Sequence, residues 1–176
     1  MGITRTRERG IAVLRVLMGL MFLYAGVEKL LGIGLQAGQS WSAGGFLQFA
    51  TLGALPGSAA NAVINPFHDF WVNLAGNPQA LNFINFIVPW GEVAIGIALT
   101  LGLATRFAAL MGTIMVGIFY LASWDFSLGP INSDLVYCFV TAFLGFAAAG
   151  EIYGLDPIVE RLTFVKRTPQ LRYVLS

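Results

Sequence analysis

The segment RVLMGLMFLYAGVEKL, residues 15–30, places charged side chains within an otherwise apolar stretch. At the i, i+3 and i+4 spacing of an α-helix, one stripe of this segment carries Arg15, Gly19, Phe22, Gly26 and Lys29. Glycines let a second helix approach closely in a membrane. A charged residue inside the membrane costs about 2.5 to 3.5 kcal/mol, so such residues usually face the bundle interior with a partner. The segment therefore predicts a membrane-spanning helix that packs through its charged stripe.

The composition of the whole chain is typical of an integral membrane protein. Of its 176 residues, 57% are hydrophobic and 11% are charged, against about 45 to 50% and about 25% in soluble domains. The net charge is only +1, so nucleic acid is not an expected partner. We expect membrane lipids around the chain instead.

Four apolar runs predict four membrane spans. They cover about residues 11–31, 83–103, 106–123 and 135–149. At about 1.5 Å per residue, each run crosses most or all of a hydrocarbon core about 30 Å thick. We therefore expect an all-α protein, an integral membrane four-helix bundle that forms a single domain over residues 1–176.

The distribution of arginine and lysine predicts the orientation of the bundle. These residues are retained on the cytoplasmic side of short loops. They precede the first run, lie between the second and third at Arg106, and follow the fourth, whereas the two other connections lack them. We expect a multi-pass protein of the cell membrane with its N- and C-termini in the cytoplasm.

Residues 32–82 form a loop much longer than the usual connection of about 4 to 6 residues. Within it, NPFHDFWVNLAGN, residues 65–77, is typical of a short helix that Asn65 caps and Gly76 ends. We expect an extracytoplasmic cap of one or two short helices. In the cytoplasmic tail, residues 150–176, we expect an interfacial helix that begins with Asp156 as its cap.

Glu92 is the residue of the apolar runs that packing alone explains least. It lies near the middle of the second run, where an unpaired carboxylate is costly. Lys29 lies near the outer end of the first run, and its long side chain can reach inward. We therefore expect an ion pair between Lys29 and Glu92.

Aromatic and polar residues gather near the outer ends of the predicted spans. With Lys29 and Glu92, the candidate cofactor-binding residues are Glu28, Trp90, Tyr120, Asp134 and Tyr137. Such a pocket suits a ring with carbonyl or hydroxyl groups, and a quinone is the cofactor we expect. Trp and Tyr also form belts at membrane boundaries, and Asp134 can cap a helix, so these structural roles stay open as alternatives. No cluster of His and Cys has metal-ligand spacing, so no haem, iron–sulfur or metal site is expected.

A second group of charged residues is predicted at the inner ends of the spans. It consists of Arg15, Arg106, Glu151 and Asp156. These residues can form a polar cluster, but anchoring of the spans in the membrane accounts for the arginines equally well.

Three stretches resemble the DoxX family of prokaryotic membrane proteins. They are RVLMGLMFLYAGVEKL (15–30), GEVAIGIALTLGLATRFAAL (91–110) and YGLD (153–156). The resemblance implies a four-helix bundle in a prokaryotic cell membrane. It also implies kinship with the small membrane subunits of archaeal thiosulfate:quinone oxidoreductase, while many members have no established activity. Recurrent polar positions of the family match Arg15, Lys29, Glu92, Arg106 and Asp156.

Three functions follow as hypotheses. The first is a membrane subunit of a quinone-linked redox system, which passes electrons from thiosulfate or a thiol toward quinone. The second is a non-catalytic membrane anchor or assembly subunit, because the chain has few redox-active side chains. The third, a small-molecule carrier, requires four spans to dimerise or rearrange. A protein partner or a second copy of the chain is expected in each case.

Overall fold

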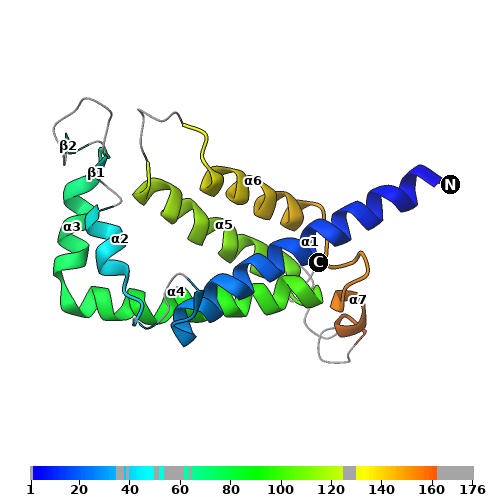
Figure 1. The fold of residues 1–176 in the computed structure, drawn as a ribbon. Coiled ribbons are helices and arrows are strands. Elements are labelled where there is room, and N and C mark those ends of the chain that lie inside the picture. The colour runs from blue at the N-terminus through cyan, green and yellow to red at the C-terminus, as the bar shows by residue number, and fades with distance from the viewer. Residues whose placement is uncertain are drawn as a thin grey trace.

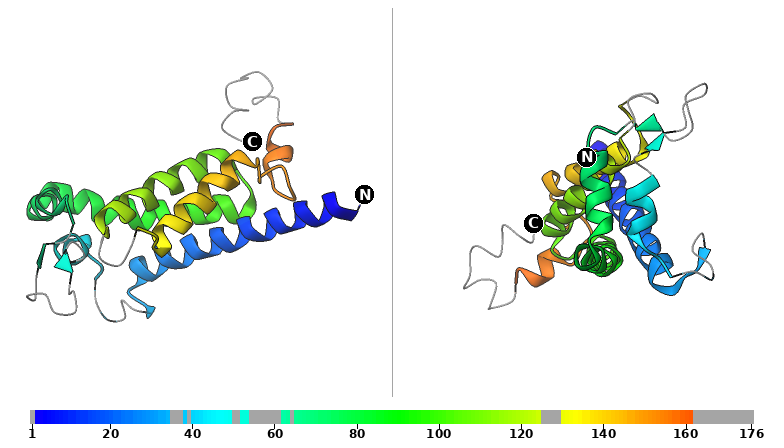
Figure 2. Two further views of the ribbon diagram at one scale, coloured as in Figure 1. Left: turned by 90° about the horizontal axis from the view of Figure 1, so that it is seen from above. Right: turned by 90° about the vertical axis from the view of Figure 1, so that its left-hand side faces the viewer.

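The computed structural model describes residues 2–34, 38, 40–49, 52–53, 62–63, 65–124 and 130–161. Its elements are α1 (Gly2–Leu31), α2 (Ala43–Phe49), β1 (Leu52–Gly53), β2 (Ala62–Val63), α3 (His68–Gly76), α4 (Pro78–Leu101), α5 (Thr105–Ala122), α6 (Ser133–Phe146) and α7 (Asp156–Val159). Helices α1, α4, α5 and α6 run along the long axis in alternating directions (Figure 1). Helices α2 and α3 lie side by side across one end, and α7 lies at the other (Figure 2).

The described part of the chain is helical, as predicted, except for one small β pair. Strands β1 and β2 are antiparallel, with Leu52 opposite Val63 and Gly53 opposite Ala62. The sequence did not predict this pair. Two residues per strand are too few for a recognisable alternation of side chains, so the sequence carried no signal for it.

Helices α1 and α4 pack with their backbones nearly in contact, and glycines make this possible. A Cβ atom at Gly19 would collide with the backbone of Thr100, and one at Gly96 would collide with the backbone of Leu23. A Cβ at Gly26 would lie 2.7 Å from the carbonyl oxygen of Pro89. The predicted glycine stripe of α1 is therefore confirmed as a helix contact.

The core of the bundle lies between α1, α4, α5 and α6. Its largest buried apolar side chains are Met18, Phe22, Ile95, Leu99, Val116 and Leu144. Helix α5 packs along α6 and also against α4. Because lipid tails are as apolar as these side chains, close packing rather than exclusion from water holds such helices together.

In the described part of the chain, three helices are long and apolar enough to cross a membrane, by length and composition. They are the segment Arg5–Leu31 of α1, α4 (Pro78–Leu101) and α5 (Thr105–Ala122). The chain is thus a multi-pass membrane protein. Helix α6 is also apolar but has 14 residues, a length of about 21 Å. The predicted fourth span, about 135–149, was too long at its C-terminal end, because Ala147 to Gly150 form turns.

The other helix ends have local causes. The Asn77 side chain accepts hydrogen bonds from Gln79 N and Ala80 N, and Pro78 opens α4. Gly102 ends the helix in a left-handed conformation with φ of 66°. Helix α4 therefore starts five residues before the predicted limit of about 83, because the Asn-Pro pair and not the first apolar residue starts it.

The predicted cap over residues 32–82 contains two short helices, α2 and α3, as expected. Its link to the bundle is Asn65, which is 1% exposed. The Asn65 side chain accepts a hydrogen bond from Phe67 N and donates to the carbonyl oxygens of Leu121 and Ala122. Asn65 was predicted to cap α3, but the structure has Phe67 at that position without a side-chain cap. Asn65 instead fastens the start of α3 to the end of α5.

The C-terminal region departs further from the prediction. Helix α7 has only four residues, Asp156–Val159, and Asp156 does not cap it. The remainder of the predicted interfacial helix, residues 162–176, lies outside the described residues.

The close contact of α1 with α4 predicts unequal effects for two glycine substitutions. Gly96→Ala should lower the stability by about 1 to 3 kcal/mol, because the new methyl group forces the two backbones apart. Gly117→Ala is the matched control, since its Cβ would lie 3.8 Å from Cys138 Sγ in ordinary contact. Thermal unfolding in detergent measures both. Equal melting temperatures for the two variants would contradict this packing.

Candidate functional site

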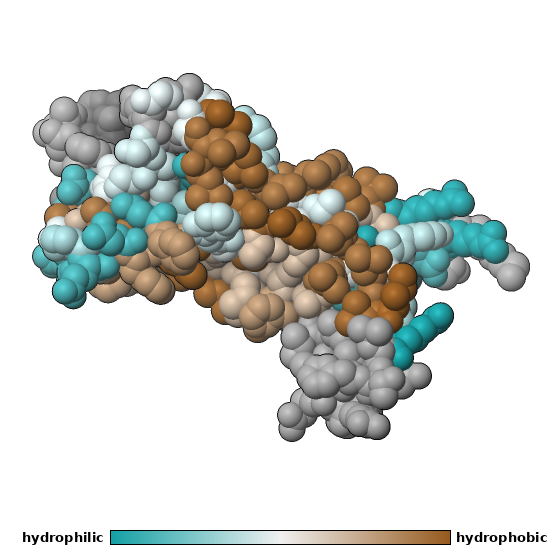
Figure 3. All heavy atoms as spheres, turned by 90° about the horizontal axis from the view of Figure 1, so that it is seen from below, coloured by the Kyte–Doolittle hydropathy of each residue, from teal (hydrophilic) through white to brown (hydrophobic). Residues whose placement is uncertain are grey.

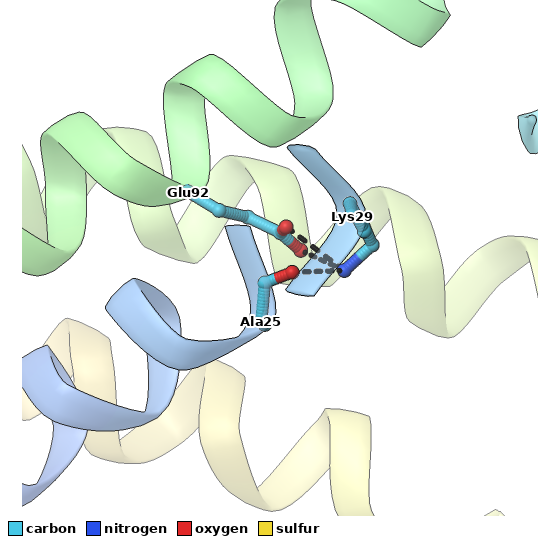
Figure 4. A network of polar contacts seen from close by, with 3 residues as sticks. All are labelled: Ala25, Lys29 and Glu92. Carbon is cyan, nitrogen blue, oxygen red and sulfur yellow. Dashed lines mark hydrogen bonds and ion pairs between the residues drawn. The ribbon is translucent and has the colours of Figure 1, made fainter. Parts of the chain in front are cut away.

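A buried ion pair joins α1 to α4 at the cap end of the bundle. The Lys29 ammonium lies 2.9 Å from Glu92 Oε1 and 2.8 Å from Glu92 Oε2. It also donates to the carbonyl oxygen of Ala25, one turn earlier in α1, at 3.2 Å (Figure 4). The predicted ion pair is confirmed. All three ammonium protons of Lys29 have an acceptor in this arrangement.

The two partners differ in exposure. The side chain of Glu92 is 4% exposed and that of Lys29 is 19% exposed. A buried carboxylate loses its hydration, and only a nearby cation with good geometry compensates for that loss. Lys29 approaches from the last turn of α1, and its ammonium meets the more deeply buried Glu92 carboxylate at 2.8 Å.

An aromatic side chain of the cap lies beside this ion pair. The Lys29 ammonium is 5.8 Å from the ring centroid of Trp41, a distance at which a cation is attracted to the ring face. Nearby, the Asn85 side chain of α4 accepts a hydrogen bond from Ala43 N at the start of α2. Helix α4 thus holds the segment before and at the start of α2 against the ion pair.

Trp41 also lines a large apolar groove between α4, α5 and the cap. The groove has a volume of about 870 Å³ and extends from Trp41 and Trp71 at the cap to Ala104 and Phe107 at the other end of α5. Its lining consists of apolar side chains and one glycine, Gly91. The groove therefore suits a long hydrophobic ligand, and polar groups adjoin both of its ends, Lys29 beside Trp41 and Asp156 at Ala104 N.

None of the predicted site residues lines this groove, and Lys29 and Glu92 adjoin it only through Trp41. Trp90 is 52% exposed on α4 and contacts Phe86. Tyr120 stacks on Trp124 and donates to Pro130 O, while Asp134 accepts from Ser123 Oγ at 2.9 Å. Tyr137 is 37% exposed on α6. Helix α6 is capped by Asn132 rather than by Asp134.

Glu28 lies next to Lys29 in α1 but takes a different direction. A Cβ atom at Gly34 would fall 2.6 Å from Glu28 Oε1, so the Glu28 carboxylate lies over the turn that follows α1. The structure therefore joins Lys29 and Glu92, but it does not gather the predicted set around one pocket. A quinone role for these residues stays a prediction.

The opposite end of the bundle has a second polar contact, centred on Arg15. Its guanidinium donates to the carbonyl oxygens of Ala149 at 2.6 Å, Ile152 at 3.1 Å and Tyr153 at 3.2 Å. Arg15 is 2% exposed. The backbone after α6 thus surrounds the arginine and ties α1 to the C-terminal end of the bundle.

Asp156 completes this polar contact from the other side. Its carboxylate accepts hydrogen bonds from Ala104 N at 2.6 Å and Thr105 N at 3.1 Å, so it caps α5. Leu155 N and Asp156 N donate to Gly102 O at the end of α4. Burial raises the pKa of the Asp156 carboxyl, while hydrogen bonds from Thr105 and Ala104 and the charge of Arg15 oppose that rise.

Of the predicted inner cluster, Arg15 and Asp156 come together, whereas the other two members lie elsewhere. Glu151 is exposed, and Arg106 lines a separate hollow between α5 and α6. Trp41, Asn85 and the carbonyl oxygens that bind Arg15 were not predicted from the sequence. The turn residues around YGLD were the only signal for those carbonyls.

The surface of the molecule agrees with insertion in a membrane. On the face that Figure 3 shows, apolar residues form the middle and hydrophilic residues gather toward the two ends. Among the described residues, no group of three or more His, Cys, Asp or Glu side chains is arranged to hold a metal ion.

The fold and these polar contacts define a multi-pass helical membrane protein in which charged residues tie the helices together. The chain belongs to the DoxX family, whose model matches residues 10–124. This range contains α4, α5 and most of α1, and it confirms the resemblance drawn from their sequences. The YGLD motif lies beyond the matched range. No curated protein and no solved structure matches the chain significantly.

The buried ion pair predicts a strong effect of removing one charge. Glu92→Gln should lower the stability by roughly 3 kcal/mol, because the Lys29 ammonium would be left without its counter-charge. Glu28→Gln is the control, a neutralised carboxylate one residue from Lys29 that should have a much smaller effect. Thermal unfolding in detergent compares them. Unchanged melting of Glu92→Gln would contradict the pairing.

The capping role of Asp156 predicts a local effect on α5. Asp156→Ala should destabilise the chain by about 1 to 2 kcal/mol, since two amide donors at the start of α5 lose their acceptor. Hydrogen exchange should accelerate in residues 105–109 in particular. Glu151→Ala, which removes an exposed carboxylate from the same turn region, serves as the control. Protection of α5 unchanged in Asp156→Ala would disprove the cap.

Proposed function

We propose that this chain is a membrane subunit of a quinone-linked redox system, with a lipid-soluble quinone bound in the groove between α4 and α5. The groove is the observation that supports the proposal. Its volume of about 870 Å³ falls within the range of about 300 to 1,000 Å³ typical of small-molecule sites. Its apolar lining fits a hydrophobic tail, and Trp41 and Trp71 at the cap end offer flat surfaces for a ring.

The ionisable groups of α1 and α4 extend this proposal to proton exchange. A quinone takes up two electrons and two protons when it is reduced. Trp41 lines the groove and also contacts the Lys29 ammonium, so it lies between the groove and the Lys29–Glu92 pair. We assign Lys29 and Glu92 as the groups that exchange protons with the quinone ring. Electrons come from thiosulfate or a thiol through a partner protein.

A specific observation favours a second candidate, a non-catalytic anchor or assembly subunit. The three protons of the Lys29 ammonium already have acceptors in Glu92 and Ala25. An ion pair whose hydrogen bonds are all made within the protein stabilises the packing of α1 on α4 without a ligand. In this role the cap and the cytoplasmic tail bind partner proteins.

We further propose four spans in a prokaryotic cell membrane, with α6 as the fourth and both termini in the cytoplasm. The N-terminus and α7 lie at the same end of the bundle, and the cap lies at the other (Figure 2). Arg5, Arg7, Arg9 and Arg106 belong to that first end. Retention of basic residues in the cytoplasm supports this orientation.

Filling the groove tests the quinone proposal. Ala94→Trp adds a ring to a residue that lines the groove, so it should abolish co-purification of quinone after mild extraction. Ile97→Trp is the matched control, because Ile97 is 44% exposed on the same helix and does not line the groove. Quinone per mole of protein is measured after solvent extraction, and reduction is assayed with thiosulfate or thiol and candidate partners. If the unaltered chain retains no quinone and supports no reduction, the second candidate stands.

A further inference from the structure

A smaller hollow lies on the opposite face of α5, where it packs against α6. It has a volume of about 410 Å³ and is lined by Arg106, Ala109, Leu110, Thr113, Ala142, Gly145 and Phe146. The α5 members are spaced by three and four residues, so they share one helix face. The hollow is separate from the α4–α5 groove, since the two share no lining residue.

Arg106 gives this hollow a polar entrance. It is the second residue of α5 and stands at the end of the bundle that also holds α7. Among the described residues that line the hollow, Arg106 alone carries a charge. Its half-exposed side chain has no carboxylate within ion-pair distance in the described part of the chain. Asp156, the acidic residue closest in the fold to the start of α5, is already engaged by the amides of Ala104 and Thr105.

We infer that this hollow binds an anionic phospholipid, with its phosphate at Arg106 and one acyl chain between α5 and α6. A guanidinium recognises a phosphate through two parallel hydrogen bonds, and its charge adds to them. Beside Arg106 the lining is mostly apolar, and the small residues Ala109, Ala142 and Gly145 leave room for a chain. The hydroxyl of Thr113, which also lines the hollow, already donates to Ala109 O. Phe146 and Leu110 border it, and they are exposed by 89% and 54%.

The arrangement differs from ordinary anchoring by a basic residue. An arginine that only reaches the headgroup region requires no hollow beside it, and it attracts any anionic headgroup without holding an acyl chain. Here the charge of Arg106 lies next to the apolar hollow between α5 and α6. The inferred site therefore demands both a phosphate with net negative charge and an acyl chain.

Native mass spectrometry of the full chain in mild detergent tests this site. The chain is titrated with phosphatidylglycerol and with phosphatidylcholine of identical acyl chains. We expect phosphatidylglycerol to bind more tightly by roughly ten-fold, the effect of one charge-assisted contact. Arg106→Gln should remove this preference, whereas Arg106→Lys should keep part of it. Arg9→Gln removes an exposed arginine at the same end of the bundle and should leave the preference intact.

A second variant separates the lipid from a free anion. Ala142→Leu fills the hollow without touching the charge, so it should weaken both lipids and leave any binding of inorganic phosphate unchanged. Weaker binding of both lipids to this variant supports the inferred binding site even if Arg106→Gln fails to fold. The inference is overturned if Arg106→Gln and Arg9→Gln behave alike. It is also overturned if Ala142→Leu binds phosphatidylglycerol as the unaltered chain does, because the arginine would then hold only the headgroup.

Discussion

The contact between α1 and α4 is the constraint on which the rest of the structure depends. In a lipid environment the hydrophobic effect gives little reason for one apolar helix to seek another, so close packing and polar contacts decide the arrangement. Gly19, Gly26 and Gly96 bring the two backbones together, and this closeness lets Lys29 reach Glu92. In the middle of α1, Arg15 is held by backbone carbonyls. Two cations of the same helix thus tie it to the rest of the bundle, Lys29 to α4 and Arg15 to the backbone after α6.

The residues that the sequence predicted correctly are those for which a wrong position carries a large energetic cost. Arg15, Lys29 and Glu92 are expensive in lipid, and the helical period aligns Arg15 and Lys29 with Gly19 and Gly26, so their burial could be predicted. The partners of Arg15 could not, because the residues around YGLD indicate a turn but not which backbone carbonyls it presents to the arginine. The capping of α5 by Asp156 was also not predicted. Asp156 lies about 50 residues after the start of α5, and the sequence pattern placed it at the start of its own helix instead.

The groove was invisible to sequence reasoning because it is a property of shape. Its lining residues are ordinary apolar side chains of α4, α5 and the cap, and none of them stands out by type. The predicted polar pocket rested instead on aromatic and acidic residues, and the structure engages these locally, as in the contacts of Tyr120 with Pro130 and of Asp134 with Ser123. Charged residues thus serve mainly to hold the helices, while apolar surfaces offer the room for ligands. The quinone proposal and the inferred lipid site, on opposite faces of α5, each combine an apolar surface with a charged group beside it, the Lys29–Glu92 pair in one and Arg106 in the other.

The most direct test of this account is a double-mutant cycle on Lys29 and Glu92. The free energy of unfolding in detergent is measured for Lys29→Gln, Glu92→Gln and the double variant. Since each single variant leaves one buried charge unpaired, the double variant should be less destabilised than the sum of the two by about 1 to 3 kcal/mol. Additive losses would mean that the two charges do not stabilise each other, and the proposed link between α1 and α4 would be wrong.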